Sequence, residues 1–339
     1  MGRKTNRVLK SDGEILDKIN YDNRTLMDDF LDYMVTTDKA PKTIKVYKSN
    51  LNIIMCWLHE RAKDKPFTEI TKRDIINMQN FMVRNGLSSA RINNLRSTMS
   101  SLSNYIETIL DDEYPNFRNI VGKIPPPPKN TVREKTVLSD EDVQELLDVL
   151  IDTGRFQVAC FIAMSVYGGA RKAETIQFKR EWFCNENVMS GLYKTPLIRT
   201  KGRGSAGKKL NKYILKSKVD YYLDLWDKER EEKGIDCEYL FVTKEDGEWV
   251  QAKESTANSF VETCSRLMDM DIYNHCLRHK YVSYLKQQGI PLDIIADIVG
   301  HDSSETTKIY DDTPKEDGFL KYFSDEGIVK HEAKNLSDL

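Results

Sequence analysis

Four consecutive prolines, Pro125 to Pro128, divide the chain into two stretches with different patterning. Proline lacks a backbone N–H and fixes its φ angle, so a run of four can neither continue a helix nor join the ladder of a sheet. Such a run forms an extended, semi-rigid spacer. With 339 residues the chain is long enough for two domains. We therefore predict four parts: a basic tail (residues 1–20), a helical domain (21–124), a linker (125–136) and a second domain (137–339).

The composition is that of an ordinary globular protein, with 40% hydrophobic and 31% charged residues. No apolar run approaches the roughly 18 residues that a membrane-spanning helix needs. The N-terminus is polar and basic, without the apolar segment of a signal peptide. The six cysteines show no Cys-x-x-Cys spacing, which favours reduced core thiols over disulfides or zinc ligands. These features predict a cytoplasmic protein with no membrane partner.

Charge is distributed unevenly along the chain. Residues 1–130 hold 21 of the 51 basic residues but only 16 of the 53 acidic ones, so this stretch is net basic and the remainder is net acidic. The whole chain has a formal charge of −2. Because the sign segregates along the chain, the overall charge neither requires nor excludes a nucleic-acid partner.

The stretch before the prolines has helical periodicity. Apolar side chains recur every three or four residues over residues 25–33, 43–58 and 88–109. Thr71 followed by Asp74 is typical of a capped helix start, reinforced by apolar residues on either side of it. The pattern predicts a compact domain of four helices.

Two of these helices carry polar rows of the residue types that bind DNA. Lysine and arginine neutralise phosphates, whereas threonine and asparagine donate hydrogen bonds to phosphate oxygens or base edges. A solvated helix face would explain either row taken alone. The candidate DNA-binding residues are Lys42, Thr43, Lys45, Lys48, Arg91, Asn94 and Arg96.

The stretch after the prolines mixes helix and strand patterns. Ser139, followed by acidic residues, predicts a capped helix, and residues 156–167 are apolar nearly all round, as in a buried central helix. Strand-like stretches follow at residues 175–178, 195–200 and 210–215. The last two flank a glycine-rich hairpin tip, and helices resume near residue 255. The predicted fold class is mainly α with a small antiparallel β-sheet.

Residues suited to phosphate chemistry follow one another along this second stretch: Arg171, Lys201, His275, Arg278, His301 and Tyr310. Breaking a phosphodiester requires cationic donors around the transition state, an in-line nucleophile, a base and an acid. His275 and Arg278 lie one turn apart on a predicted helix. Gly300, directly before His301, is a natural helix stop.

The order and spacing of these residues resemble the tyrosine recombinase (phage integrase) family. Its members show Arg, Lys, His-x-x-Arg, His or Trp, and Tyr in that order. The resemblance extends to His-x-Leu-Arg-His at residues 275–279 and to Gly-His-x-Ser at residues 300–303. It covers residues 22–325 and implies a helical core-binding domain followed by an α+β catalytic domain.

The family's reaction, carried over to this chain, would be a site-specific cleavage and rejoining of double-stranded DNA. Tyr310 would attack the scissile phosphate and form a 3′-phosphotyrosyl link, while Arg171 and Arg278 hold the non-bridging oxygens. The resemblance implies no cofactor and no metal, because the covalent link preserves the energy of the phosphodiester.

The remaining roles follow from the same resemblance. Lys201 would act as general acid, with Lys208 and Lys209 as competitors on the same hairpin. His275 would act as base or proton shuttle and His301 would donate to the phosphate. Glu174, three residues after Arg171, would orient this cluster.

The family also acts as four protomers on two duplexes. The resemblance therefore implies a tetramer on DNA, with the tail at residues 315–339 docked on a neighbouring protomer. An accessory directionality or DNA-bending protein is a further expected partner. The apolar residues suited to that docking are Phe319, Leu320, Tyr322 and Phe323.

Three alternatives remain open at the level of sequence. His275 and His279 have the i, i+4 spacing of metal ligands, but Arg278 beside them would repel a cation. Asp311 and Asp312 follow the tyrosine directly, which fits a DNA-binding regulator that keeps the fold without recombining. A cleavage-only, topoisomerase-like enzyme would use the same tyrosine chemistry.

Overall fold

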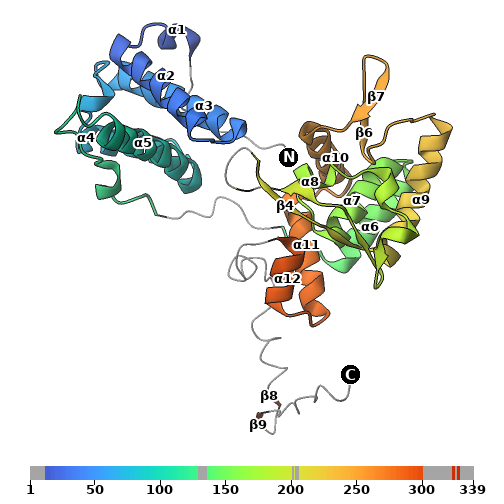
Figure 1. Cartoon of the computed structure of the whole chain (residues 1–339). Helices are drawn as coiled ribbons and strands as arrows, with labels where there is room; N and C mark the ends of the chain where they lie inside the picture. The colour runs from blue at the N-terminus through green and yellow to red at the C-terminus, as the bar shows by residue number, and fades with distance from the viewer. Residues whose placement is uncertain are drawn as a thin grey trace. The chain divides into compact units, whose positions relative to one another are not determined.

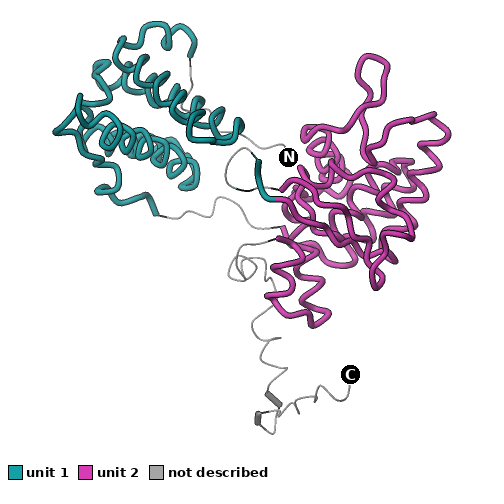
Figure 2. Tube along the Cα trace, viewed as in Figure 1, with its two compact units in different colours: residues 1–134, 201–208 teal, residues 135–200, 209–339 magenta. Residues whose placement is uncertain are grey.

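The computed structural model describes residues 12–128, 136–200, 202 and 206–300, together with the backbone of two short strands, β8 (Phe323–Ser324) and β9 (Gly327–Ile328). Two compact units make up the chain (Figure 2). One contains residues 1–134 and 201–208, and the other contains residues 135–200 and 209–339. Helices dominate the described residues of both, and short strands occur between residues 188 and 251 (Figure 1). The predicted fold class, mainly α with small antiparallel sheets, is confirmed.

Residues 12–128 of the first unit form helices joined by turns and loops. Its helices are α1 (Gly13–Leu16), α2 (Tyr21–Thr36), α3 (Pro41–Arg61), α4 (Lys72–Arg84) and α5 (Ser89–Ile109), with 3₁₀ turns at Phe67–Glu69 and Val121–Lys123. The four long helices match the predicted ones, whereas the single turn of α1 was not expected. Their apolar faces meet in one core that includes Leu51, Ile54, Met78, Leu95 and Leu102.

A reciprocal side-chain cap sets where α4 begins. The Thr71 hydroxyl accepts from the backbone N–H of Asp74, and the Asp74 carboxylate accepts from the backbone N–H of Thr71 at 2.9 Å. This reciprocal pair satisfies two donors that the start of α4 would otherwise leave without partners. The capped helix start predicted at Thr71 is confirmed.

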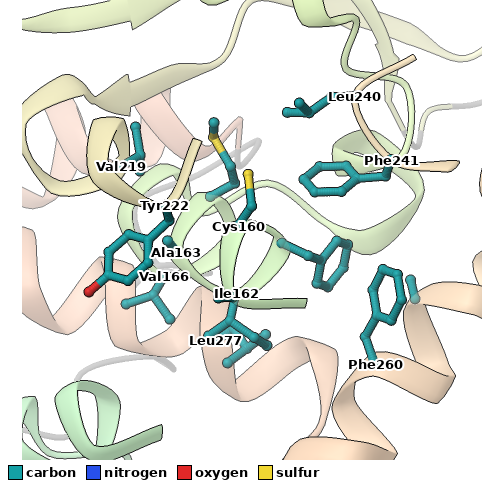
Figure 3. Close-up of a cluster of buried hydrophobic side chains, with 14 of the residues drawn as sticks. Cys160, Ile162, Ala163, Val166, Val219, Tyr222, Leu240, Phe241, Phe260 and Leu277 are labelled. Carbon is teal, nitrogen blue, oxygen red and sulfur yellow. The ribbon is translucent and has the colours of Figure 1, made fainter. Parts of the chain in front are cut away.

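The second unit is built around one buried helix, α7 (Phe156–Gly168), which packs against α6 (Asp140–Asp152), α9 (Lys216–Glu232) and α11 (Asn274–Gln287). Cys160, Ile162 and Ala163 of α7 lie in the core, close to Phe241, Phe260 and Leu277 from later segments (Figure 3). The prediction of a central apolar helix is confirmed. Ser139 caps α6 through its hydroxyl, as predicted.

Short strands lie beside this helical core. β1 (Val188–Met189), β2 (Leu192–Lys194) and β5 (Tyr213–Leu215) form an antiparallel sheet in that order. β3 (Ile198–Thr200) pairs with β4 (Lys208–Leu210), and β6 (Val242–Glu245) with β7 (Glu248–Gln251). The strands predicted at residues 195–200 and 210–215 are confirmed in part.

Two predictions about the second unit are wrong. Residues 175–178 do not form a strand, because Glu174 accepts from the backbone N–H of Arg171 and so caps a short helix, α8 (Lys172–Thr175). Helices resume well before residue 255, at α9. Val219, Tyr222, Leu223 and Trp226 of α9 are buried at helical spacing, a signal that was present in the sequence.

The last described helices are α10 (Glu254–Leu267), α11 and α12 (Leu292–Val299). Gly300 ends α12 in the left-handed conformation, with φ of 73°. This conformation favours glycine, and a Cβ atom there would lie 2.4 Å from Leu210 Cδ1, so that side chain would have to move. Among the described residues, no helix has the length and apolarity needed to cross a bilayer.

Candidate active site

The turn after α7 places Arg171 and Glu174 at the edge of the core. Gly169 ends α7 with φ of 60°, and a Cβ atom there would lie 2.2 Å from the Tyr281 ring. The Glu174 carboxylate accepts from both the backbone N–H and Nη1 of Arg171, each at 2.9 Å. The Glu174 side chain is 2% exposed and that of Arg171 is 29% exposed. The turn therefore buries the carboxylate and leaves the guanidinium accessible.

Lys212 joins this pair from the loop between β4 and β5. Its ammonium lies 2.9 Å from Glu174 Oε2, and its side chain is 1% exposed. The backbone holds Lys212 in place, since its N–H donates to Thr195 Oγ1 and its carbonyl accepts from the N–H of Thr195. Lys212 is not among the site residues predicted from the sequence. Leu210, Lys212 and Ile214 alternate along the predicted strand stretch, and that pattern could have placed the lysine on the inward face.

Arg278 of α11 completes the cluster and is fully buried. Its Nη1 donates to the carbonyl of Gly169 at 2.6 Å and its Nη2 to the carbonyl of Val299 at 2.7 Å. The Lys212 ammonium lies 3.5 Å from the same Val299 oxygen. These carbonyls end α7 and α12, where the last C=O groups lack helical partners and the helix dipole favours cations. Arg278 therefore ties two glycine-terminated helices together.

The charges in this cluster depend on one another. Burial alone would raise the pKa of Glu174, but the Lys212 ammonium and the hydrogen bonds from Arg171 outweigh it and lower the pKa. Burial lowers the pKa of Lys212, and Glu174 opposes that shift while Arg278 and Arg171 add to it. Two cations, Arg171 and Lys212, thus contact one ionised carboxylate, and Arg278 shares the Val299 carbonyl with Lys212. The excess of positive charge suits an anionic ligand such as a phosphate.

The two histidines of α11 differ in exposure. His275 is exposed, whereas His279 is 7% exposed, and their rings lie 5.1 Å apart edge to face. Within the described part of the chain, no three His, Cys, Asp or Glu residues group as metal ligands would. All six cysteines are described, and all are free thiols.

Several predicted site residues lie outside the described residues. These are Lys201, His301 and Tyr310, with Asp311 and Asp312 beside the tyrosine. The same holds for the side chains of the tail at residues 315–339. The described backbone that precedes His301 and Tyr310 ends at Gly300, directly after the Val299 carbonyl that Arg278 and Lys212 contact.

The predicted polar row on α3 is exposed. Lys42, Thr43, Lys45 and Lys48 all face solvent. The row therefore lies where a phosphate backbone could reach it.

The predicted residues on α5 are placed differently. Asn94 is exposed, and half-buried Arg91 donates to its side-chain oxygen and to that of Asn50. Arg96 is 8% exposed and donates to the carbonyls of Val121 and Ile124. The structure therefore corrects the prediction that Arg96 faces DNA. Its place in the apolar row of α5 explains the difference.

Both units match known family models. Residues 136–316 match the phage integrase family. Residues 26–116 match the phage integrase N-terminal SAM-like domain. The first of these matches alone covers more than half of the chain.

The chain is also similar to named relatives over most of its length. It is 32% identical over 302 residues to the SPbeta prophage-derived recombinase-like protein YomM of Bacillus subtilis, covering 87% of this chain and 89% of that protein. It is 23% identical to the tyrosine recombinase XerD of Rickettsia bellii, covering 75% and 90%.

Solved structures share the fold. The Tn1549 transposon integrase in complex with circular intermediate DNA matches with a TM-score of 0.62 and 17% identity, covering 87% of this chain and 98% of that one. A lambda integrase tetramer bound to a Holliday junction matches with a TM-score of 0.63 and 16% identity, covering 85% and 77%. With both domains matched in order and a relative above 30% identity, the chain belongs to the phage integrase family of tyrosine recombinases.

Proposed function

We propose that this chain is a site-specific DNA recombinase that cleaves and rejoins strands through a 3′-phosphotyrosyl link formed by Tyr310. The observation that supports this most is a cluster of cations at the ends of α7 and α12. Arg171 and Lys212 contact the buried Glu174 carboxylate, and Arg278 donates to the carbonyls of Gly169 and Val299. A phosphoryl-transfer transition state spreads negative charge over its non-bridging oxygens, and fixed cationic donors stabilise that charge.

The two arginines bind the scissile phosphate in this proposal. The guanidinium of Arg171 is accessible while Glu174 fixes its orientation. Arg278 is held by the ends of two helices, because its guanidinium donates to the carbonyls of Gly169 and Val299. These cations supply the charge that a metal ion supplies in other phosphoryl-transfer enzymes, so the reaction as proposed needs no metal.

Three further residues complete the proposed site. Lys201 protonates the departing 5′-oxygen, His275 relays the proton of the nucleophile, and His301 donates to the phosphate. The exposed position of His275 on α11 leaves its ring accessible to such a relay. A general acid and base of this kind contribute typically about 10²- to 10⁴-fold each.

We further propose that the first unit binds the DNA backbone through the exposed row on α3. Recombination joins two duplexes, and the lambda integrase structure with the same fold is a tetramer on a Holliday junction. A tetramer of this chain on DNA, with residues 315–339 docked on a neighbouring copy, follows by analogy.

Trapping of the covalent link tests the proposal. Wild-type protein is incubated with a randomised library of nicked duplexes, in which cleavage beside the nick releases a short fragment and prevents religation. Adducts that resist detergent are recovered and sequenced over successive rounds. We expect the wild-type chain to enrich one sequence family as covalent adducts, and Tyr310→Phe to yield none while binding the same duplexes.

Two other outcomes have defined meanings. Enrichment of a tightly bound sequence without any adduct would contradict the proposal and support the regulator. Adducts that relax supercoiled plasmids but never join two sites would support the topoisomerase-like alternative.

A further inference from the structure

Lys212 has no part in the roles assigned above, yet it is buried at the centre of the cluster. Only two lysines among the described residues are buried, Lys212 at 1% and Lys280 at 6% exposure. Burying an ammonium group costs several kcal/mol of desolvation, which its ion pair repays only in part. A hydrophobic side chain at such a position would avoid this desolvation cost.

The Glu174 carboxylate links Lys212 to Arg171. Its Oε1 accepts from Arg171 Nη1, whereas its Oε2 accepts from the backbone N–H of Arg171 and from the Lys212 ammonium. Lys212 therefore helps to hold the Glu174 side chain in the rotamer that orients the Arg171 guanidinium. Without Lys212, the buried carboxylate would have Arg171 as its remaining ion-pair partner.

Lys212 also reaches the end of α12, where its ammonium lies 3.5 Å from the Val299 carbonyl oxygen. Gly300 follows directly, and a Cβ atom on it would lie 3.9 Å from the same ammonium. From this point the chain continues to His301 and Tyr310. One side chain thus contacts both the turn that carries Arg171 and the helix end that leads to the proposed nucleophile.

We propose that Lys212 is a positioning residue. Through Glu174, it fixes the position of the Arg171 guanidinium relative to the end of α12. This inference rests on the proposed function. Misplacing a reacting group by about 1 Å can cost on the order of 100-fold in rate. The effect falls on the chemical step, because Lys212 acts through Glu174 and Arg171, whereas phosphate contacts on the protein surface set DNA affinity.

Lys280 provides a matched control. It is also a buried lysine of the second unit, and its ammonium lies 2.8 Å from Asp140 at the start of α6. Asp140 is 62% exposed and is not part of the cluster. Lys280→Met therefore removes a buried ammonium and breaks an ion pair, as Lys212→Met does, without changing the partners of Glu174.

The experiment measures the rate of covalent adduct formation on the selected nicked duplex, at saturating DNA, together with the thermal midpoint. We expect Lys212→Met to lower the maximal rate by about 100-fold. The DNA concentration that gives half of that rate should stay within about threefold of the wild-type value, because phosphate contacts on the protein surface set DNA affinity. Lys280→Met should form adducts within about threefold of the wild-type rate, since it leaves the cluster's contacts intact. An unchanged rate in Lys212→Met, or an equal loss in Lys280→Met, would overturn the inference.

A double variant separates positioning from charge neutralisation. In Lys212→Met with Glu174→Gln, both charges of the buried pair are gone, so the thermal midpoint should recover toward wild type. The rate should stay at least about tenfold below wild type, because the contact of Lys212 with both segments is then lost and Arg278 alone still joins them. Joint recovery of stability and rate would show that Lys212 only neutralises Glu174. If wild-type protein itself forms no adduct, the proposed function is contradicted. That result is distinguishable from a loss of rate, or an unchanged rate, in the Lys212 variant.

Discussion

The two units hold the cations of their proposed functional sites in opposite ways. Lys42, Lys45 and Lys48 on α3 are exposed on a helix face. Arg278 and Lys212 of the cluster are almost completely buried, and carbonyl or carboxylate oxygens hold them. Both sets suit phosphate, but only the second is part of the core.

This difference determines how each set responds to change. Exposed charges act nearly independently, and salt screens them over about 8 Å at physiological ionic strength. Buried charges are interdependent, because removing one leaves a partner in the protein interior without compensation. Substitutions in the cluster should therefore have large, coupled effects, and those on α3 small and additive ones.

The largest effect is expected for Arg278→Met. The change leaves the carbonyls of Gly169 and Val299 buried without this donor, which should cost about 2–6 kcal/mol of unfolding free energy at about 1–3 kcal/mol per group. Adduct formation should fall below detection. Denaturant titration and the trapping assay measure both.

Arg96→Met is the matched control for that variant. Arg96 is also a buried arginine that donates to two backbone carbonyls, but in the first unit. It should lose comparable stability and still form adducts at temperatures where it is folded. Equal loss of adducts in both variants would mean that the cluster has no special role.

A smaller effect, with a defined pH dependence, is expected for Glu174→Gln. The folded-state pKa of Glu174 lies below its ordinary value of 4.5, so its ionised form contributes stability above that pH and loses it as the pH falls through the folded pKa. At pH 7 the variant should be about 3 kcal/mol less stable than wild type. That difference should shrink as the pH is lowered from 6 to 3.

Glu245→Gln serves as the control for that titration. Glu245 forms an exposed ion pair with Lys253, so its loss should change stability by less than about 1 kcal/mol throughout. A stability gap in Glu174→Gln that stays constant with pH would contradict the buried ion-pair assignment.

The smallest effects are expected on α3. Each of Lys42→Gln, Lys45→Gln and Lys48→Gln that loses a phosphate contact should reduce the slope of log affinity against log salt by about 0.9. The three effects should add. Exposed Lys18, which lies outside this row, is the control and should leave the slope unchanged on replacement by Gln. Strongly non-additive losses would contradict the separation between exposed and buried cations.

Local signals predicted much of the fold. The pairing of Thr71 with Asp74 and the periodicity of α5 depend on residues close in sequence, and both predictions were correct. The prediction of a strand at residues 175–178 was wrong because the Glu174 side chain caps the backbone of Arg171 and starts a helix there. Secondary-structure propensities of the individual residues do not reveal that side-chain contact.

The candidate site was less predictable than the fold. The Lys212–Glu174 ion pair joins residues 38 positions apart, and a sequence without its tertiary contacts does not show such a pair. Arg96 follows Ile92 by four residues, on the apolar row of α5, so periodicity favoured burial over DNA contact. In each case the residue type indicated a possible role in binding phosphate. The burial of the side chain in the folded protein determined which groups it contacts.

The most direct test of the account is the identity of the residue that carries the DNA. Trapped adducts are digested with trypsin and nuclease, and the nucleotide-bearing peptide is sequenced by mass spectrometry. We predict a 3′-linked nucleotide on the peptide of residues 309–315, attached to Tyr310, the only tyrosine in that peptide. A nucleotide on any other residue would contradict the account.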